Sequence, residues 1–267
     1  MSAIDKYNKR AKKINSLLCV GLDPDFEKIP EKFKATPFPQ FEFNKYIINE
    51  THEYAAAYKP NIAFYEAKGA KGISELQMTT DYIQKNHPDI FIMLDAKRAD
   101  VGNTNTGYVT EAFDLLKVDG ITINPYLGQE AVQPFLNRID KISSVLALNS
   151  NPGAGEFQNL DVGGGKKLWQ QVVENVSTKW NTNNNCMIVM GATHPEEMKE
   201  ARSMTGATFL VPGIGSQGGD LEMVMRNGLD SDGLGLMINS SRGIIFSEDP
   251  KKEAQKLCEE IRKYQTN

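Results

Sequence analysis

The sequence predicts an α/β protein built as a single (β/α)8 TIM barrel, because three observations agree. Eight short apolar runs alternate with amphipathic stretches along the 267 residues. The runs are continuously apolar, as strands are when helices cover both faces of a parallel sheet. Eight β-then-α units in about 250 residues match the usual size of such a barrel. A doubly wound open sheet is the alternative. The predicted strands are residues 17–23, 58–65, 90–97, 120–126, 144–150, 186–192, 208–215 and 233–239.

Helices are predicted between the strands and at both ends of the chain. The basic run in residues 5–16 has no apolar stretch after it, so it predicts a solvated N-terminal helix rather than a targeting or nucleic-acid-binding arm. Residues 40–57 predict an amphipathic helix, and residues 251–265 predict a closing helix. The apolar stripe of the 40–57 helix is expected to contain Phe41, Tyr46, Ile47, Tyr54 and Ala57.

Composition narrows the class of protein. The net charge of −4 argues against nucleic acid as a partner, and 40% hydrophobic residues provide for a substantial core. No apolar stretch approaches the ~18 residues that a membrane span needs, so we expect a soluble, cytoplasmic protein without a membrane partner. The three cysteines and three histidines are widely spaced. We therefore expect neither a disulfide framework nor a metal site. No linker divides the chain, which predicts one domain over residues 1–267.

Two segments are longer than ordinary loops. Residues 24–40 contain four prolines, and residues 151–166 contain five glycines. Both follow predicted strand ends on the side where barrels carry their active sites. The second segment is either a mobile lid or a surface insertion.

The third predicted strand ends in charges instead of ordinary turn residues. Asp95 and Lys97 follow its apolar run, and Asp100 comes just after it. Alternation along a strand would place Asp95 and Lys97 on one face. An ammonium flanked by two carboxylates stays charged, which favours proton donation over nucleophilic amine chemistry. A structural salt bridge at the rim is the alternative.

Polar residues accompany three other predicted strands. Asp23 ends the first strand, and Ser150 ends the fifth. Lys59 and Asn61 lie on one face of the second strand. Lys59 could instead extend along the apolar surface to reach water, and Ser150 could cap a turn.

The last two strands predict an anion site. A Gly-rich turn, `VPGIGSQGGD`, follows the seventh strand, and `INSSRG` follows the eighth. Backbone N–H groups at helix N-termini beside an arginine bind anions, and barrels often bind phosphate at this position. We expect Gln217 and Arg242 to hold a phosphate ester.

These motifs together resemble the orotidine 5′-phosphate decarboxylase family, in the longer bacterial branch that carries `SNPGA`. The motif `DAKRAD` fits the D-x-K-x-x-D signature, and `GLDPD`, `YKPN`, `NSNPGA` and `PGIGSQGGD` follow the family order. The resemblance spans residues 17–245. It implies a (β/α)8 barrel that converts orotidine 5′-monophosphate to UMP and CO2 without a metal or an organic cofactor.

The resemblance also implies roles for individual residues. Lys97 would protonate C6, Asp95 would face the substrate carboxylate, and Lys59 and Asp100 would complete a charged array. Asp100 and Thr104 would come from the partner subunit, so each active site would need a homodimer. By the same resemblance, Asp23 and Lys59 would contact the ribose, and Ser150 would contact the pyrimidine. Gln217 and Arg242 would contact the phosphate.

One departure and two alternatives accompany this resemblance. Ser241 precedes Arg242 at a position where many relatives have glycine. The backbone geometry at this position therefore has to be compatible with a serine side chain. The first alternative is a Mg²⁺-dependent sugar-phosphate decarboxylase or aldolase of the same superfamily, for which Glu66 is a weak candidate ligand. The second is a nucleotide-binding barrel without activity.

Overall fold

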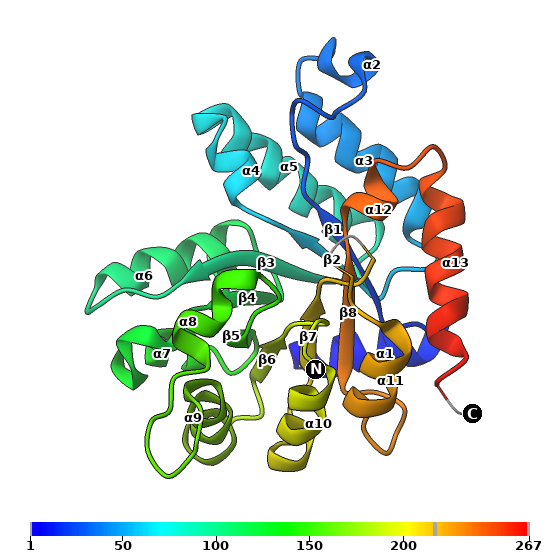
Figure 1. Cartoon of the computed structure of the whole chain (residues 1–267). Coiled ribbons are helices and arrows are strands. Elements are labelled where there is room, and N and C mark those ends of the chain that lie inside the picture. Colours follow the sequence, from blue (N-terminus) through cyan, green and yellow to red (C-terminus); the bar gives the residue numbers. More distant parts are fainter. Residues whose placement is uncertain (1, 216–217, 266–267) are drawn as a thin grey trace.

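Eight parallel strands close into a barrel in the computed structural model, which describes residues 2–215 and 218–265 (Figure 1). Each strand pairs with the next, and β1 closes the ring by pairing with β8. The predicted (β/α)8 barrel is therefore confirmed, and the open sheet is not formed. The strands are β1 Leu18–Leu22, β2 Ala57–Pro60, β3 Phe91–Arg98, β4 Gly120–Ile123, β5 Ile142–Leu148, β6 Cys186–Met190, β7 Phe209–Pro212 and β8 Leu236–Ser240.

Helices surround this barrel (Figure 1). The α-helices are α1 Ala3–Ile14, α2 Glu31–Lys34, α3 Pro39–Thr51, α4 Ala63–Glu66, α5 Gly69–Asn86, α6 Thr104–Val109, α7 Gln129–Leu136, α8 Gly155–Gln158, α9 Leu168–Asn175, α10 Pro195–Met204, α11 Leu221–Gly228, α12 Arg242–Ile245 and α13 Pro250–Arg262. Short 3-10 turns are η2 Pro125–Leu127 and η3 Pro152–Ala154, and π-helical turns are η1 Thr110–Leu115 and η4 Val176–Trp180. No helix among the described residues is both long and apolar enough to cross a bilayer.

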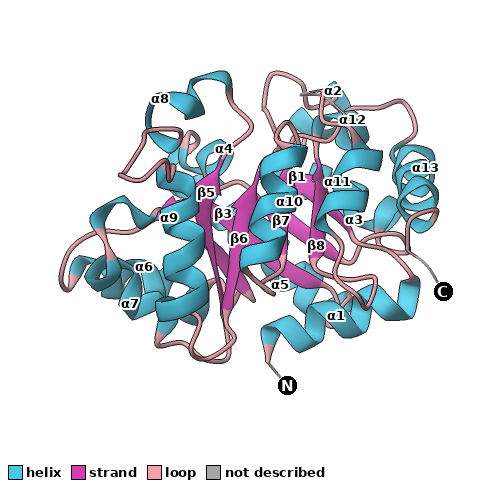
Figure 2. Ribbon diagram, turned by 60° about the horizontal axis from the view of Figure 1, so that its bottom comes forward, coloured by secondary structure: helices cyan, strands magenta, loops and turns pink. Residues whose placement is uncertain are grey.

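Helix α1 closes one end of the barrel, which corrects the prediction of a solvated helix (Figure 2). Tyr7 is fully buried, its ring lies edge-on to that of Phe91, and its hydroxyl donates to the carbonyl of Leu236 at 2.6 Å. Phe91 and Leu236 begin β3 and β8, so α1 covers the amino ends of the strands. Ala3, Tyr7 and Ala11 are four residues apart and form the buried side of α1, whereas Lys9, Lys12 and Lys13 are exposed. Lys6 is mostly buried and pairs with Asp119.

Two predicted boundaries are wrong for identifiable reasons. The predicted second strand, residues 58–65, ends at Pro60 because Ala63 begins α4, and the side chain of Asn61 accepts a hydrogen bond from the N–H of Ala63. The predicted helix 40–57 ends at Thr51. Its expected last residue, Ala57, pairs with β1 instead, because sheet hydrogen bonds outweigh helical continuation there.

The two long segments lie at the end of the barrel opposite α1 (Figure 2). Residues 24–40 contain α2 and the start of α3, and residues 151–166 contain η3 and α8. The N–H of Asn149 donates to Oε1 of Gln158 at 2.8 Å, which ties α8 to the end of β5. Both segments therefore rim the carboxyl ends of the strands, where barrels place their active sites.

Candidate active site

A polar cavity of about 270 Å³ opens at the carboxyl ends of the strands. Strands β2 to β8 contribute to it, together with residues from several of the segments that follow the strands, including the segment after β1. Predicted residues that line it are Asp23, Lys59, Asn61, Asp95, Lys97, Ser150, Ser241 and Arg242. Other lining residues belong to the quoted motifs without having been named individually, and they are Asn149, Asn151, Pro212, Gly213, Ile214 and Asn239. The lining residues outside these motifs are Thr122, Leu146, Val189 and Leu210. One cavity thus joins the charged end of β3 to the segments after β7 and β8.

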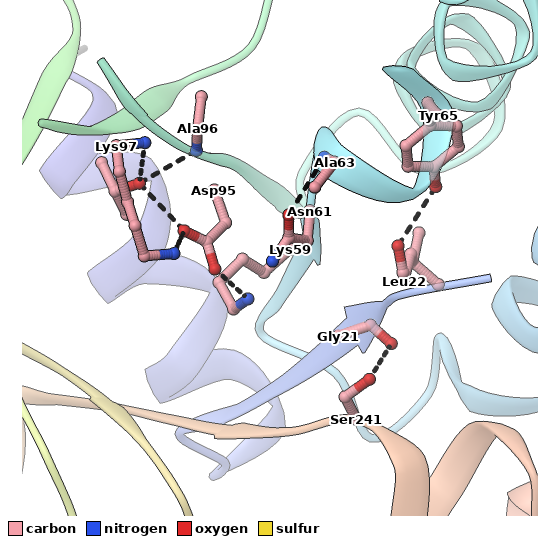
Figure 3. Close-up of polar contacts among 11 residues, drawn as sticks. Gly21, Leu22, Lys59, Asn61, Ala63, Tyr65, Asp95, Ala96, Lys97 and Ser241 are labelled. Carbon is pink, nitrogen blue, oxygen red and sulfur yellow. Dashed lines mark hydrogen bonds and ion pairs between the residues drawn. The ribbon is translucent and has the colours of Figure 1, made fainter. Parts of the chain in front are cut away.

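Asp95 is the centre of a charged cluster in this cavity (Figure 3). Its Oδ2 accepts a hydrogen bond from Lys59 Nζ at 2.8 Å, and its Oδ1 accepts one from Lys97 Nζ at 2.5 Å. The side chains of Lys59 and Asp95 are 4% and 12% exposed, whereas that of Lys97 is 49% exposed. The two lysines therefore differ in access: Lys59 is fixed in the wall, and Lys97 stands at the mouth.

The charges of this cluster stabilise one another. Burial alone would raise the pKa of Asp95, but attraction to Lys59 and Lys97 outweighs it and holds that pKa well below its usual value. Burial alone would lower the pKa of Lys59, but Asp95 and Asp23 outweigh it and raise that pKa. The carboxylate and the buried ammonium therefore both stay charged near neutral pH.

The end of β3 is irregular, which corrects the simple alternation expected there. Leu94 pairs with Ile121 and Arg98 pairs with Ile123, so three residues of β3 face the single residue between them on β4. Lys97 has a φ of +50°, in the left-handed region. Asp95 and Lys97 do approach each other, but through this irregularity and not through an unbroken strand.

Two acceptors in the cavity wall have no hydrogen-bond partner among the described residues. They are Oδ1 of Asp23 and Oδ1 of Asn239, and both atoms are buried. Buried acceptors normally find a donor. These positions suit a ligand that brings hydroxyl or N–H donors.

The part of the cavity where the sequence predicts an anion site contains Gly213, Ser241 and Arg242. Gly213 has a φ of +104°, a conformation that favours glycine and lets the turn after β7 bend sharply. Ser241 fits because Gly21 faces it, and the Ser241 Oγ donates to the Gly21 carbonyl at 3.4 Å (Figure 3). Its backbone leads directly into α12, so a serine is compatible with this geometry. Gln217 lies outside the described residues.

Asp100 and Thr104 do not line the cavity of their own chain. The Asp100 carboxylate accepts a hydrogen bond from the N–H of Val101 at 2.7 Å, and Thr104 is an exposed residue that begins α6. After β3 the chain runs outward from the barrel into α6 (Figure 1).

The residues missed by sequence reasoning fall into two kinds. Thr122 and Asn239 are polar residues within apolar strand runs, a signal that was present but weak. Leu146, Val189 and Leu210 form an apolar side of the cavity. Nothing in the sequence distinguishes these three from core residues, because strands buried on both faces are apolar throughout.

A parallel barrel whose mouth combines a fixed ammonium–carboxylate cluster with an arginine and a glycine turn defines an enzyme acting on a phosphate ester. The model of the Orotidine 5'-phosphate decarboxylase / HUMPS family matches residues 16–257, and the chain belongs to this family.

Curated relatives and solved structures agree with this membership. The chain is 47% identical to "Orotidine 5'-phosphate decarboxylase" of Flavobacterium johnsoniae, over 94% of this chain and 91% of the relative. It is 43% identical to the protein of that name from Cellvibrio japonicus, over 96% and 93% of the two chains. The solved structure of Leishmania donovani OMP decarboxylase is 40% identical, with a TM-score of 0.89 and 99% of each chain covered.

Proposed function

We propose that this protein decarboxylates orotidine 5′-monophosphate to UMP and CO2, the last step of de novo synthesis of pyrimidine nucleotides. The observation that carries the proposal is the cluster of Asp95 between Lys59 and Lys97, in one cavity with Arg242. Family membership and the relatives' names support the same reaction. The chemistry needs no added cofactor, because a lysine of the chain supplies the proton.

In the proposed reaction Lys97 is the acid. When the bond between C6 and the carboxylate breaks, its electron pair stays on C6, and the Lys97 ammonium gives that carbon a proton as CO2 leaves. An ammonium already fixed 2.5 Å from Asp95 needs little reorganisation to stabilise the developing negative charge. Asp95 faces the substrate carboxylate, and Lys59 keeps Asp95 charged.

The remaining wall residues bind the substrate in this proposal. Asp23 and Lys59 bind ribose hydroxyls, and the buried, unpartnered Oδ1 of Asp23 supports that role. Ser150 contacts the pyrimidine, beside the apolar side formed by Leu146. Arg242 holds the phosphate, together with Gln217 from the turn after β7. Phosphate binding far from C6 can then contribute to positioning the reacting carbon.

The Mg²⁺-dependent alternative is less well supported by the contacts. Lys59 Nζ lies where it neutralises Asp95, so a divalent cation there would stand beside a positive charge. Glu66, the candidate ligand, forms an ion pair with Arg98 instead. Among the described residues, no three His, Cys, Asp or Glu side chains gather in a way that could hold a metal ion.

The direct test is an assay of purified protein with orotidine 5′-monophosphate and excess EDTA, followed by loss of substrate absorbance. Conversion to UMP supports the substrate and the metal independence together. UMP binding without conversion would favour a binding protein without activity. Activity on sugar phosphates that requires Mg²⁺ would favour the alternative enzyme.

We also propose a homodimer with shared active sites. Asp100 and Thr104 leave the cavity of their own chain, as a contribution to a partner's cavity requires. Val101, Tyr126 and Leu127, from the segments after β3 and β4, are 61%, 75% and 49% exposed. Exposed apolar side chains of this size often mark a surface that another chain covers.

Complementation between inactive variants tests the shared sites. If the sites are shared, a mixed dimer of Lys97→Ala and Asp100→Ala has both defects in the same cavity, which leaves the other cavity intact. We expect the mixture to recover activity that neither variant has alone. A mixture that stays inactive after proven subunit exchange would contradict the sharing.

We further propose that the enzyme acts in the cytoplasm. Cys19, Cys186 and Cys258 are buried and form no disulfide. Unpaired thiols are usual where the surroundings are reducing. Fluorescence microscopy of the tagged protein in its own cell would test the location.

A further inference from the structure

Thr122, in β4, lies opposite the irregular end of β3. The ladder pairs Leu94 with Ile121 and then Arg98 with Ile123. Asp95, Ala96 and Lys97 therefore face one residue, Thr122. A strand that carries extra residues at such a point leaves backbone N–H groups without regular partners, and buried N–H groups need other acceptors.

The Thr122 hydroxyl provides the missing acceptor. Its Oγ1 accepts hydrogen bonds from the N–H of Ala96 at 3.0 Å and from the N–H of Lys97 at 2.9 Å. It donates its own proton to Oδ1 of Asp95 at 3.0 Å. A hydroxyl has one donor and two acceptor positions, so all of them are used. Thr122 is 1% exposed, so water does not compete strongly for these bonds.

These three bonds hold the reacting groups. Oδ1 of Asp95 is also the oxygen that accepts from Lys97 Nζ. The same hydroxyl therefore contacts the backbone of Lys97 and the carboxylate that directs its side chain. The φ of +50° at Lys97 is uncommon for a residue with a Cβ, and such conformations persist where their surroundings enforce them.

Other buried hydroxyls show that this bonding is specific to Thr122. Ser144, in β5, pairs with Thr122 in the ladder, yet its buried Oγ has no hydrogen-bond partner among the described residues. Thr51, also buried, donates to the carbonyl one helical turn before it, that of Ile47 at 2.7 Å. A hydroxyl in the core of this protein therefore does not by itself organise a charged side chain.

We propose that Thr122 is a positioning residue for the decarboxylation: through one hydroxyl it fixes the Lys97 backbone and the Asp95 carboxylate. This inference rests on the proposed function and deepens it. Thr122 acts through Lys97 and Asp95, so it should affect the chemical step far more than the binding of nucleotide.

Two substitutions at Thr122 separate positioning from packing. Thr122→Val keeps the shape and removes the hydroxyl, whereas Thr122→Ser keeps the hydroxyl and removes a methyl group. We expect Thr122→Val to lower kcat about 100-fold, since a displacement of about 1 Å can cost that much, while KM and the Kd of UMP change less than threefold. Thr122→Ser should recover most of kcat.

The matched control is Thr51→Val, which removes an equally buried hydroxyl in α3, outside the cavity. It should lower the melting temperature and leave kcat unchanged. If Thr122→Val does not fold, Thr122→Ala removes the same hydroxyl without overpacking and takes its place.

The outcomes distinguish this inference from the proposed function. Wild-type protein that does not turn over substrate would overturn both. With an active wild type, an unchanged kcat in the variant that lacks the hydroxyl would overturn the positioning role alone. A loss of UMP affinity equal to the loss of kcat, or a folded Thr122→Ser variant as slow as Thr122→Val, would also overturn it.

Discussion

Lys59 and Asp95 form a buried ion pair across neighbouring strands, with Nζ 2.8 Å from Oδ2. Lys59 lies in β2 and Asp95 in β3, so the pairing of these two strands brings them together. Removing one partner from a buried pair typically costs about 3–5 kcal/mol, because the other charge remains without compensation. The pair therefore couples the stability of the barrel to the charge of its active site.

Asp95→Asn should destabilise the protein by about 3–5 kcal/mol at pH 7, and the difference from wild type should shrink in acid. The pKa of Asp95 is lowered in the folded protein, so its stabilising effect is present above the unfolded value of about 3.9. Below that pH the effect is lost by about 1.4 kcal/mol per pH unit. Urea unfolding of both proteins at pH 7, 4 and 3 measures this. A difference that is the same at all three pH values would contradict the assignment.

Lys97→Ala should lower kcat by about 10²- to 10⁴-fold, the usual contribution of a general acid. UMP should still bind, because the other wall residues remain. Calorimetry with UMP and an absorbance assay measure the two effects. Lys199→Ala, at an exposed position of α10, is the control and should change neither. Retained turnover in Lys97→Ala would rule out its role as proton donor.

Gly21→Ala should be destabilising because Gly21 gives room to Ser241. A Cβ at residue 21 would lie 2.5 Å from the Cβ of Ser241 and 2.9 Å from its Oγ. Overpacking of this kind costs about 1–3 kcal/mol. Thermal unfolding should show the loss, and Ser241→Gly in the same chain should restore much of it. Gly206→Ala, where an added Cβ would meet nothing within 4 Å, is the control.

The contact between Gly21 and Ser241 couples two strand ends that are 220 positions apart in sequence. If the two substitutions act independently, the double variant will be no more stable than Gly21→Ala. That result would mean that the close approach has no energetic consequence.

The sequence allowed the barrel and most of the cavity to be predicted, because each depends on short-range patterns. Apolar runs located all eight strands, and the polar residues at their ends mark the carboxyl face. The sequence did not allow the residue at which β2 ends to be predicted. Ile62 to Tyr65 are apolar and fit a strand or a helix equally well, since periodicity cannot separate the two in so short a run.

The other features of the site depend on how strands and subunits pair in three dimensions. Thr122 gains its importance from the irregular register between β3 and β4, which no local pattern encodes. The apolar wall residue Leu146 resembles any core leucine in sequence. Asp100 carries the expected charge, but its position relative to a partner's cavity depends on how two chains associate.

Arg242→Ala should weaken the binding of UMP while leaving that of uridine nearly unchanged. A hydrogen bond to a charged group contributes about 1.5–3 kcal/mol, which corresponds to a roughly 10- to 100-fold increase in the Kd of UMP. Uridine has no phosphate, so it should report only the ribose and pyrimidine contacts. Arg226→Ala, which removes an exposed arginine that pairs with Glu222 on α11, is the control and should affect neither ligand. Equal losses for UMP and uridine in Arg242→Ala would mean that this arginine shapes the cavity instead of binding phosphate.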